Sequence, residues 1–118
     1  MNLPAFDRFC ASLPATTTVV QWGDAHVWKV GGKVFALGRD EAGTLAVTFK
    51  VSPIGYEILS EQPGLRPAPY LASRGLKWIQ HYGKPGLSDR ELKAHIRAAH
   101  QMIADALPKK TLIALGLG

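Results

Sequence analysis

Cysteine is almost absent from this sequence, which has one thiol, Cys10, in 118 residues. A single thiol excludes an internal disulfide, and no other cysteine or histidine stands beside it at the spacing of a zinc-binding motif. The sequence also lacks any hydrophobic run that approaches the roughly 20 residues of a membrane-spanning helix. Its first residues include Pro4, Asp7 and Arg8, which do not fit a signal peptide. We therefore expect a cytoplasmic protein with a buried thiol and no membrane contact.

Acidic residues are missing from a long internal stretch, between Glu61 and Asp89. Residues 1–65 carry five Lys and Arg against six Asp and Glu, whereas residues 66–118 carry nine against three. The net charge of +5 therefore originates in the second half of the chain. A region with charges of one sign can steer polyanions toward a protein, although a basic protein need not bind one.

Recognisable catalytic and metal-binding patterns are missing as well. His95 and His100 are five residues apart, so they lie about 140° from each other around a helix and cannot bind one ion together. No serine or cysteine stands in a turn typical of a catalytic nucleophile. We expect a protein that is not an enzyme and that uses no metal or other cofactor.

The length predicts one domain over residues 1–118, and the first half combines a helix with strands. Apolar residues recur every three to four positions between Asn2 and Pro14, which predicts a helix there. β-Branched residues predict a strand over 18–22. The apolar runs 26–30 and 33–37 flank Gly31-Gly32, a pair suited to a hairpin turn with positive φ. Alternation over 45–51 predicts a strand with one face on the core and the other toward solvent.

The second half has helical signals on either side of a proline-rich segment. Ser52-Pro53 predicts the start of a short helix that ends by Pro63-Gly64. The prolines that follow predict a stiff extended connector over residues 65–70. The runs 70–73 and 77–82 flank Arg74-Gly75 and predict a second hairpin with a basic tip. A capping-box pattern at residues 88–91 opens an amphipathic helix that ends near Pro108. The apolar tail 111–118 fits a strand, a docked end or a frayed end.

Several motifs, in this order along the chain, resemble the MmcQ/YjbR family of small bacterial and archaeal proteins. They are Leu13-Pro14-Ala15-Thr16-Thr17, Trp22-Gly23-Asp24, Val30-Gly31-Gly32-Lys33-Val34-Phe35-Ala36, Pro63-Gly64-Leu65-Arg66-Pro67-Ala68-Pro69-Tyr70, Trp78, Ser88-Asp89-Arg90-Glu91-Leu92 and Leu107-Pro108-Lys109-Lys110. The resemblance implies an α+β two-layer sandwich like that of secretion chaperones. It also implies an antiparallel sheet of about five strands with N-terminal, middle and C-terminal helices, and two projecting hairpins known as a double wing.

The family is described as DNA-binding, so the resemblance implies non-specific contacts with DNA phosphates. Two hairpins, a loop, the basic face of the last long helix and the segment after it would supply them. The expected contact residues are Lys29, Lys33, Arg66, Arg74, Lys77, Arg90, Lys93, Arg97, Lys109 and Lys110. We expect a monomer in this role.

Other interpretations remain open for the same residues. A non-catalytic module could hold a protein partner or a small ligand with its 64–70 loop and the open face of its sheet. Arg66 could instead tie down its own loop. The cations at positions 90, 93 and 97 could be only the solvated side of a helix. Trp22, Trp28 and Trp78 could stack on bases, but we expect them in the core.

Overall fold

The computed structural model of the chain describes residues 1–69, 71 and 75–118. Its described strands form one fully antiparallel sheet in the order β1-β2-β3-β4-β6-β5. The elements are α1 (Leu3–Ser12), β1 (Thr16–Gln21), β2 (Ala25–Val30), β3 (Lys33–Glu41), β4 (Thr44–Lys50), α2 (Pro53–Leu59), β5 (Leu65–Pro67), β6 (Trp78–His81), α3 (Asp89–Asp105) and α4 (Lys109–Ala114). The predicted α+β class is confirmed, with six strands where about five were expected.

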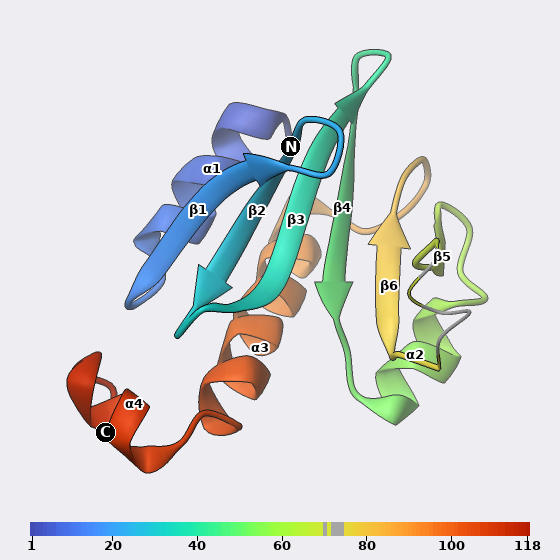
Figure 1. Cartoon of the computed structure of the whole chain (residues 1–118). Coiled ribbons are helices and arrows are strands. Elements are labelled where there is room, and N and C mark those ends of the chain that lie inside the picture. Colours follow the sequence, from blue (N-terminus) through green and yellow to red (C-terminus); the bar gives the residue numbers. More distant parts are fainter. Residues whose placement is uncertain (70, 72–74) are drawn as a thin grey trace.

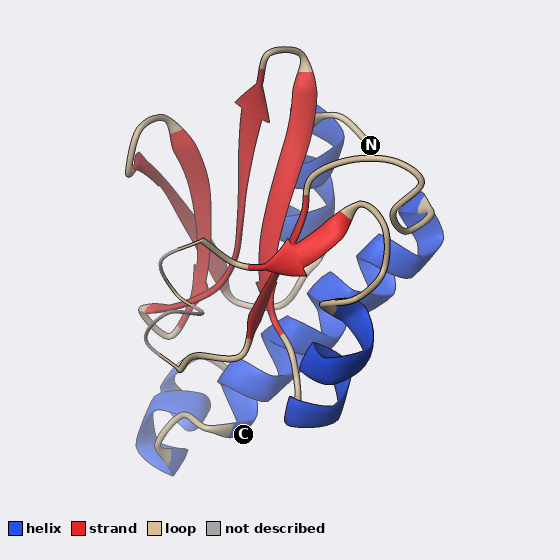
Figure 2. Cartoon of the chain, turned by 90° about the vertical axis from the view of Figure 1, so that its right-hand side faces the viewer, coloured by secondary structure: helices blue, strands red, loops and turns tan. Residues whose placement is uncertain are grey.

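Helices cover one face of the sheet and leave the other face open (Figures 1 and 2). The fully buried side chains on the covered face include Phe6 from α1, Phe35, Phe49 and Ile79 from the strands, and Ile96 from α3. These large apolar groups form a single core between the layers, and their removal from water provides the main stabilisation of the fold. Among the described residues, no helix has the length and hydropathy of a membrane span.

Helices α1, α2 and α3 begin at the residues that the local sequence predicts, whereas α4 was not predicted. The side chains of Asn2 and Ser52 accept hydrogen bonds from Ala5 N and Gly55 N at 2.9 and 3.0 Å. At the start of α3, Ser88 Oγ accepts from Glu91 N at 3.1 Å, and Glu91 Oε1 accepts from Ser88 N at 3.0 Å. Each bond satisfies an amide that the first helical turn leaves without a partner, so these caps explain where the helices start.

Three expectations about strands and tryptophans need correction. In β4, Ala46 and Thr48 point to the open face but are only 4 % exposed, so neither face of this strand is turned toward bulk solvent. The predicted connector begins with a strand, because residues 65–67 pair with β6. Trp22 is 58 % exposed and does not belong to the core, whereas Trp28 and Trp78 are buried.

The second arm of the second predicted hairpin is strand β6, which pairs with β5 on one side and with β4 on the other. Tyr70 and residues 72–74, which include most of the predicted first arm and the basic tip at Arg74, lie outside the described residues. The tail contains helix α4, and its Leu112, Leu115 and Leu117 pack against the core. It is therefore a docked helical end.

Candidate nucleic-acid interface

The antiparallel order of the strands sorts the charged residues between the two ends of the sheet. Strands β2 and β4 end where β3 and β6 begin, and this end carries Lys29, Lys33, Lys50 and Lys77. Lys33 pairs with Val30 across the β2–β3 turn, and Val51 N donates to Lys77 O at 3.1 Å. The opposite end carries three carboxylates, Asp24 after β1 and Asp40 and Glu41 at the end of β3, together with two cations, Arg39 and Lys84. The two ends of the sheet therefore differ in net charge, and the lysine-rich end is the more positive one.

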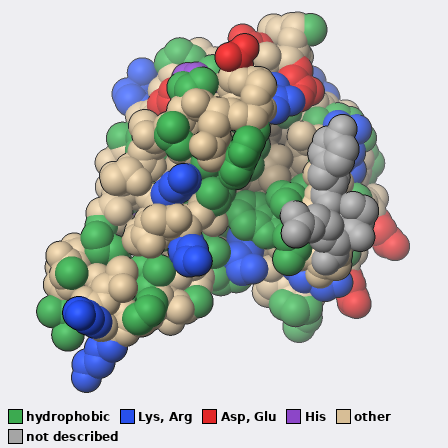
Figure 3. Space-filling view, viewed as in Figure 1, with side chains coloured by type: hydrophobic (Ala, Val, Ile, Leu, Met, Phe, Trp, Pro, Cys, Tyr) green, Lys and Arg blue, Asp and Glu red, His purple; other side chains and the backbone are tan. Residues whose placement is uncertain are grey.

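Helix α4 adds two cations at the lysine-rich end. Leu107, just before α4, packs so closely on the β2–β3 turn that a Cβ atom on Gly31 would lie 2.6 Å from Leu107 Cδ1. This contact holds the exposed Lys109 and Lys110 near the turn. Figure 3 shows basic side chains along the lower part of the open face and on the projection that α4 forms. We call Lys29, Lys33, Lys50, Lys77, Lys109 and Lys110 the basic end.

The lysines of the basic end are not neutralised by ion pairs. None of them lies within 4.0 Å of a carboxylate oxygen among the described residues, although Glu57 and Glu61 are exposed on and after the nearby α2. Two of them lie over aromatic rings instead: Lys77 Nζ is 4.6 Å from the ring centroid of Tyr56, and Lys50 Nζ is 6.0 Å from that of Trp78. Rings of this kind orient an ammonium group without removing its charge.

Four other predicted contact residues lie away from the basic end. Arg90, Lys93 and Arg97 form an exposed stripe on α3, in the helical layer, and Lys93 Nζ and Arg97 Cζ lie 5.8 and 5.3 Å from the ring centroid of Phe9 in α1. Arg66 lies on the open face of the edge strand β5, and Arg74 is outside the described residues. The structure thus brings together five of the ten predicted residues, Lys29, Lys33, Lys77, Lys109 and Lys110. It adds Lys50, which the sequence analysis missed.

One row of side chains crosses the open face through all six strands. The register pairs Val19 with Val27, Val27 with Leu37, Leu37 with Thr48, Thr48 with Gln80 and Gln80 with Arg66. Part of this row forms a hollow of about 570 Å³. Its lining residues are Trp22, Leu37, Arg39, Glu41, Ala46, Thr48, Arg66, Pro69, Leu71 and Gln80. The hollow combines an apolar floor with a few polar groups, which is the composition of many ligand sites.

Two arginines border the hollow, and they differ in their hydrogen-bond and ion-pair partners. Arg66 Nε donates to Gln80 Oε1 at 2.8 Å, and its guanidinium lies 4.3 Å from the ring centroid of Tyr82. No carboxylate among the described residues pairs with Arg66. Arg39 donates to Trp22 O and lies 3.6 Å from Glu41 Oε1, so its charge is already engaged. Among the described residues, Arg66 is therefore the cation of the hollow that has no carboxylate partner.

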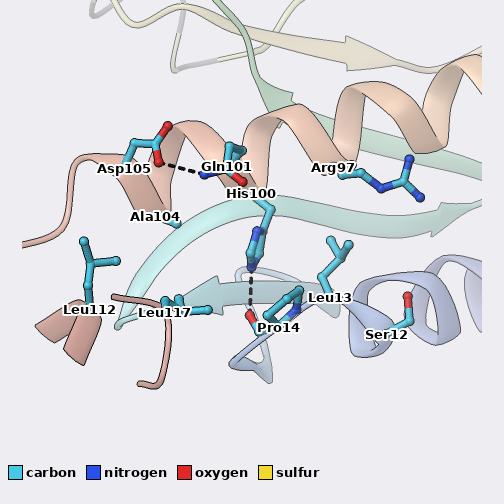
Figure 4. Close-up of a pocket in the computed structure, with 10 residues that line it drawn as sticks. All are labelled: Ser12, Leu13, Pro14, Arg97, His100, Gln101, Ala104, Asp105, Leu112 and Leu117. Atoms are coloured by element: carbon cyan, nitrogen blue, oxygen red, sulfur yellow. Dashed lines mark hydrogen bonds between the residues drawn. The ribbon is translucent and has the colours of Figure 1, made fainter. Parts of the chain in front are cut away.

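A second hollow, of about 480 Å³, lies between the end of α1, α3 and the C-terminal segment (Figure 4). His100 projects from α3 and its Nε2 lies 2.8 Å from Pro14 O, while its ring meets Phe35 edge-on with the centroids 5.2 Å apart. His95 stacks on Phe49 at 5.6 Å. Both histidines thus serve packing on the core, and burial lowers the pKa of His95.

Cys10 is fully buried in α1, as the sequence analysis expected. Burial, with a smaller contribution from the negative charge of Asp7, raises the pKa of the Cys10 thiol far above its usual range. The thiol therefore stays protonated at neutral pH and acts as an apolar side chain of the core.

The fold defines a two-layer α+β sandwich with an open, hollowed sheet face. The family model described as YjbR matches residues 11–102, and the chain belongs to the YjbR family. The crystal structure of the Deinococcus radiodurans protein DR2400, described as a DUF419 domain, is similar at 20 % identity with a TM-score of 0.83, over 99 % of this chain and 89 % of that one. A Pseudomonas syringae protein is similar at 22 % identity and a TM-score of 0.71, over 87 % and 99 %. No curated protein matches the sequence. At these identities the two structures support the fold.

Proposed function

We propose that this protein binds double-stranded DNA with little sequence preference, through phosphate contacts made by the basic end. The observation that carries the proposal is the gathering of six lysines at one end of the sheet, none of them ion-paired among the described residues. Lysines bind phosphate as mobile point charges and release counterions from the duplex, which favours binding to any sequence. In this role the protein holds DNA and performs no chemistry on it.

The arrangement of the basic end sets the expected strength of binding. Its lysines come from strand ends, a turn and a short helix, and no long recognition helix projects from that end among the described residues. In this proposal the protein makes no specific contacts with base edges, and its affinity depends on phosphate contacts alone. Non-specific binding of this kind has a Kd of about 10⁻⁴ to 10⁻⁶ M and weakens steeply with salt.

Two matched variants distinguish the basic end from the α3 stripe. The triple variant Lys33→Gln, Lys109→Gln, Lys110→Gln and the triple variant Arg90→Gln, Lys93→Gln, Arg97→Gln each remove three positive charges at exposed positions. Anisotropy of a labelled random-sequence duplex, measured over a range of KCl concentrations, gives Kd and its salt dependence. We expect the first variant to lower the slope of log K against log salt by roughly 3 and the second to leave it unchanged.

Two results would overturn this proposal. The first is no binding by the wild-type protein at about 100 μM and low salt, since non-specific binders retain DNA there. The second is an equal loss of affinity in both triple variants, because binding would then follow net charge rather than the basic end.

The hollow on the open face supports a second candidate function, the binding of a small organic anion. Arg66 has no carboxylate partner among the described residues and stands beside Gln80, above a floor that includes Leu37 and Ala46. This combination suits a ligand with a carboxylate or phosphate at one end and an apolar body. NMR titration with aryl and alkyl carboxylates should shift resonances around the hollow, and Arg66→Gln should abolish the shifts. Titrations without localised shifts at millimolar ligand would exclude this candidate.

A further inference from the structure

The two edges of the sheet differ in length, charge and proline content, three features that decide how readily an edge strand pairs with another chain. Strand β5 is three residues long and includes Arg66 and Pro67. Strand β1 at the other edge is six residues long, has the sequence TTTVVQ, and contains neither a charge nor a proline. Short length, a charge and a proline all discourage edge-to-edge pairing, so β5 is protected and β1 is not.

Strand β1 is also accessible along its length. Its four central residues, 17–20, are exposed, with Val19 at 39 % and Val20 at 58 %. Among the described residues, no backbone hydrogen bond joins β1 to any element other than β2. The outward amides and carbonyls of this strand are thus available to another strand, and its valines would lose part of their exposed surface to the neighbouring side chains of such a strand.

We propose that β1 pairs with β1 of a second copy of this chain to form an antiparallel, two-fold symmetric dimer with one continuous sheet. A two-fold axis at Val19 places Val19 opposite Val19 of the partner subunit and Thr18 opposite Val20 of the partner subunit. It also places Thr17 opposite Gln21 of the partner subunit. Opposed residues then project on the same face of the sheet, as antiparallel pairing requires. No like charges meet along the seam.

A second copy suits this edge better than an unrelated strand for electrostatic reasons. Because the two strands run in opposite directions, the basic end of each subunit lies beside the end of the other that carries Asp24, Asp40 and Glu41. This juxtaposition opposes the repulsion expected between two chains that each carry a net charge of +5. The protected β5 edge cannot continue the sheet, so the assembly closes at two subunits instead of extending into a fibre.

Sedimentation equilibrium over a wide range of protein concentrations tests the dimer. The wild-type protein should approach twice the mass of one chain as concentration rises. Val20→Lys places two ammonium groups at the seam and should weaken association by about tenfold or more. The matched control is Ile54→Lys, which changes a 71 % exposed residue on α2, away from β1, and should leave association unchanged.

Hydrogen exchange provides a readout that needs no variant. The outward amides of residues 16–21 should become protected as protein concentration rises, while amides in β5 should not. A wild-type chain that stays monomeric at every concentration would overturn the proposal in favour of the monomer expected from the sequence. Equal effects of Val20→Lys and Ile54→Lys would overturn it too, because association would then not involve β1.

Discussion

Leu107 packs directly on Gly31, and this contact between the link from α3 to α4 and the β2–β3 turn holds α4 at the end of the sheet. Both methyl groups of Leu107 occupy the space where a side chain on Gly31 would begin, with Cδ1 and Cδ2 at 2.6 and 2.9 Å from an added Cβ. Gly31 also has a φ of +59°, a conformation that side chains other than glycine rarely adopt. One glycine therefore permits both the turn and the approach of the C-terminal segment.

Gly31→Ala should lower the free energy of unfolding by about 2–3 kcal/mol, because it combines backbone strain with a clash against Leu107. Its neighbour provides a matched control. Gly32 has a φ of +78° and nothing within 4 Å of an added Cβ. Gly32→Ala should therefore lower the free energy of unfolding only through backbone strain, by about 1 kcal/mol. Urea denaturation measures both values. A cost for Gly31→Ala no larger than that for Gly32→Ala would show that the Leu107 contact is unimportant.

Asp7 ties α1 to β2 and provides a second test of the fold. Its two oxygens lie 2.7 Å from His26 Nδ1 and 2.9 Å from Trp28 Nε1, which donates to it. Asp7→Ala would leave the indole N–H of the buried Trp28 without its partner, so we expect a loss of about 1–3 kcal/mol of stability. Asp105, which accepts from Gln101 on the surface, is the control: Asp105→Ala should change stability by at most about 0.5 kcal/mol. Equal losses in the two variants would contradict this account.

His81 predicts a dependence of stability on pH. Burial lowers the pKa of His81 from 6.5, and its Nε2 accepts a hydrogen bond from Leu87 N at 3.0 Å, which requires the neutral ring. Because the folded pKa is below the unfolded one, the unfolded chain binds the proton more readily. The contribution of His81 is thus complete above the unfolded pKa and is lost as pH falls through the folded pKa.

The measurement is the urea midpoint of the wild-type protein and of His81→Gln between about pH 7.5 and about pH 5. The wild type should lose stability over this interval, and the loss should be smaller in His81→Gln. Burial lowers the pKa of His95 as well, so part of the loss should persist in that variant. A pH profile that His81→Gln does not flatten would assign the entire dependence to other groups.

Local patterns allowed much of the fold to be predicted. The caps at Asn2, Ser52 and Ser88 and the Gly31-Gly32 turn are determined by neighbouring residues, and the structure confirms each of them. Strand β5 was expected to be only a connector, because its pairing with β6 joins segments that are distant in the chain. Prolines indicate an extended backbone in either case, so the sequence does not distinguish a connector from an edge strand.

The candidate site was less predictable, because it depends on which strand ends meet. Charge counted along the chain assigned the basic region to residues 66–118, yet the basic end takes three of its six lysines, at positions 29, 33 and 50, from the first half. The β2–β3 hairpin and the direction of β4 together place Lys50 at the same end of the sheet as Lys33. That inference requires the order of the strands in the sheet, and the order is a non-local property.

Lys50 therefore gives the most direct test of the basic end. Lys50→Gln removes one charge near Trp78, and Lys84→Gln removes one from the exposed loop after β6, at the opposite end of the sheet. If Lys50 contacts phosphate, its replacement should reduce the salt slope of DNA binding by about 1, and replacement of Lys84 should not change it. Anisotropy titrations at several salt concentrations measure both slopes. Identical slopes for the two variants would mean that Lys50 attracts DNA only through its contribution to net charge and makes no contact with a phosphate.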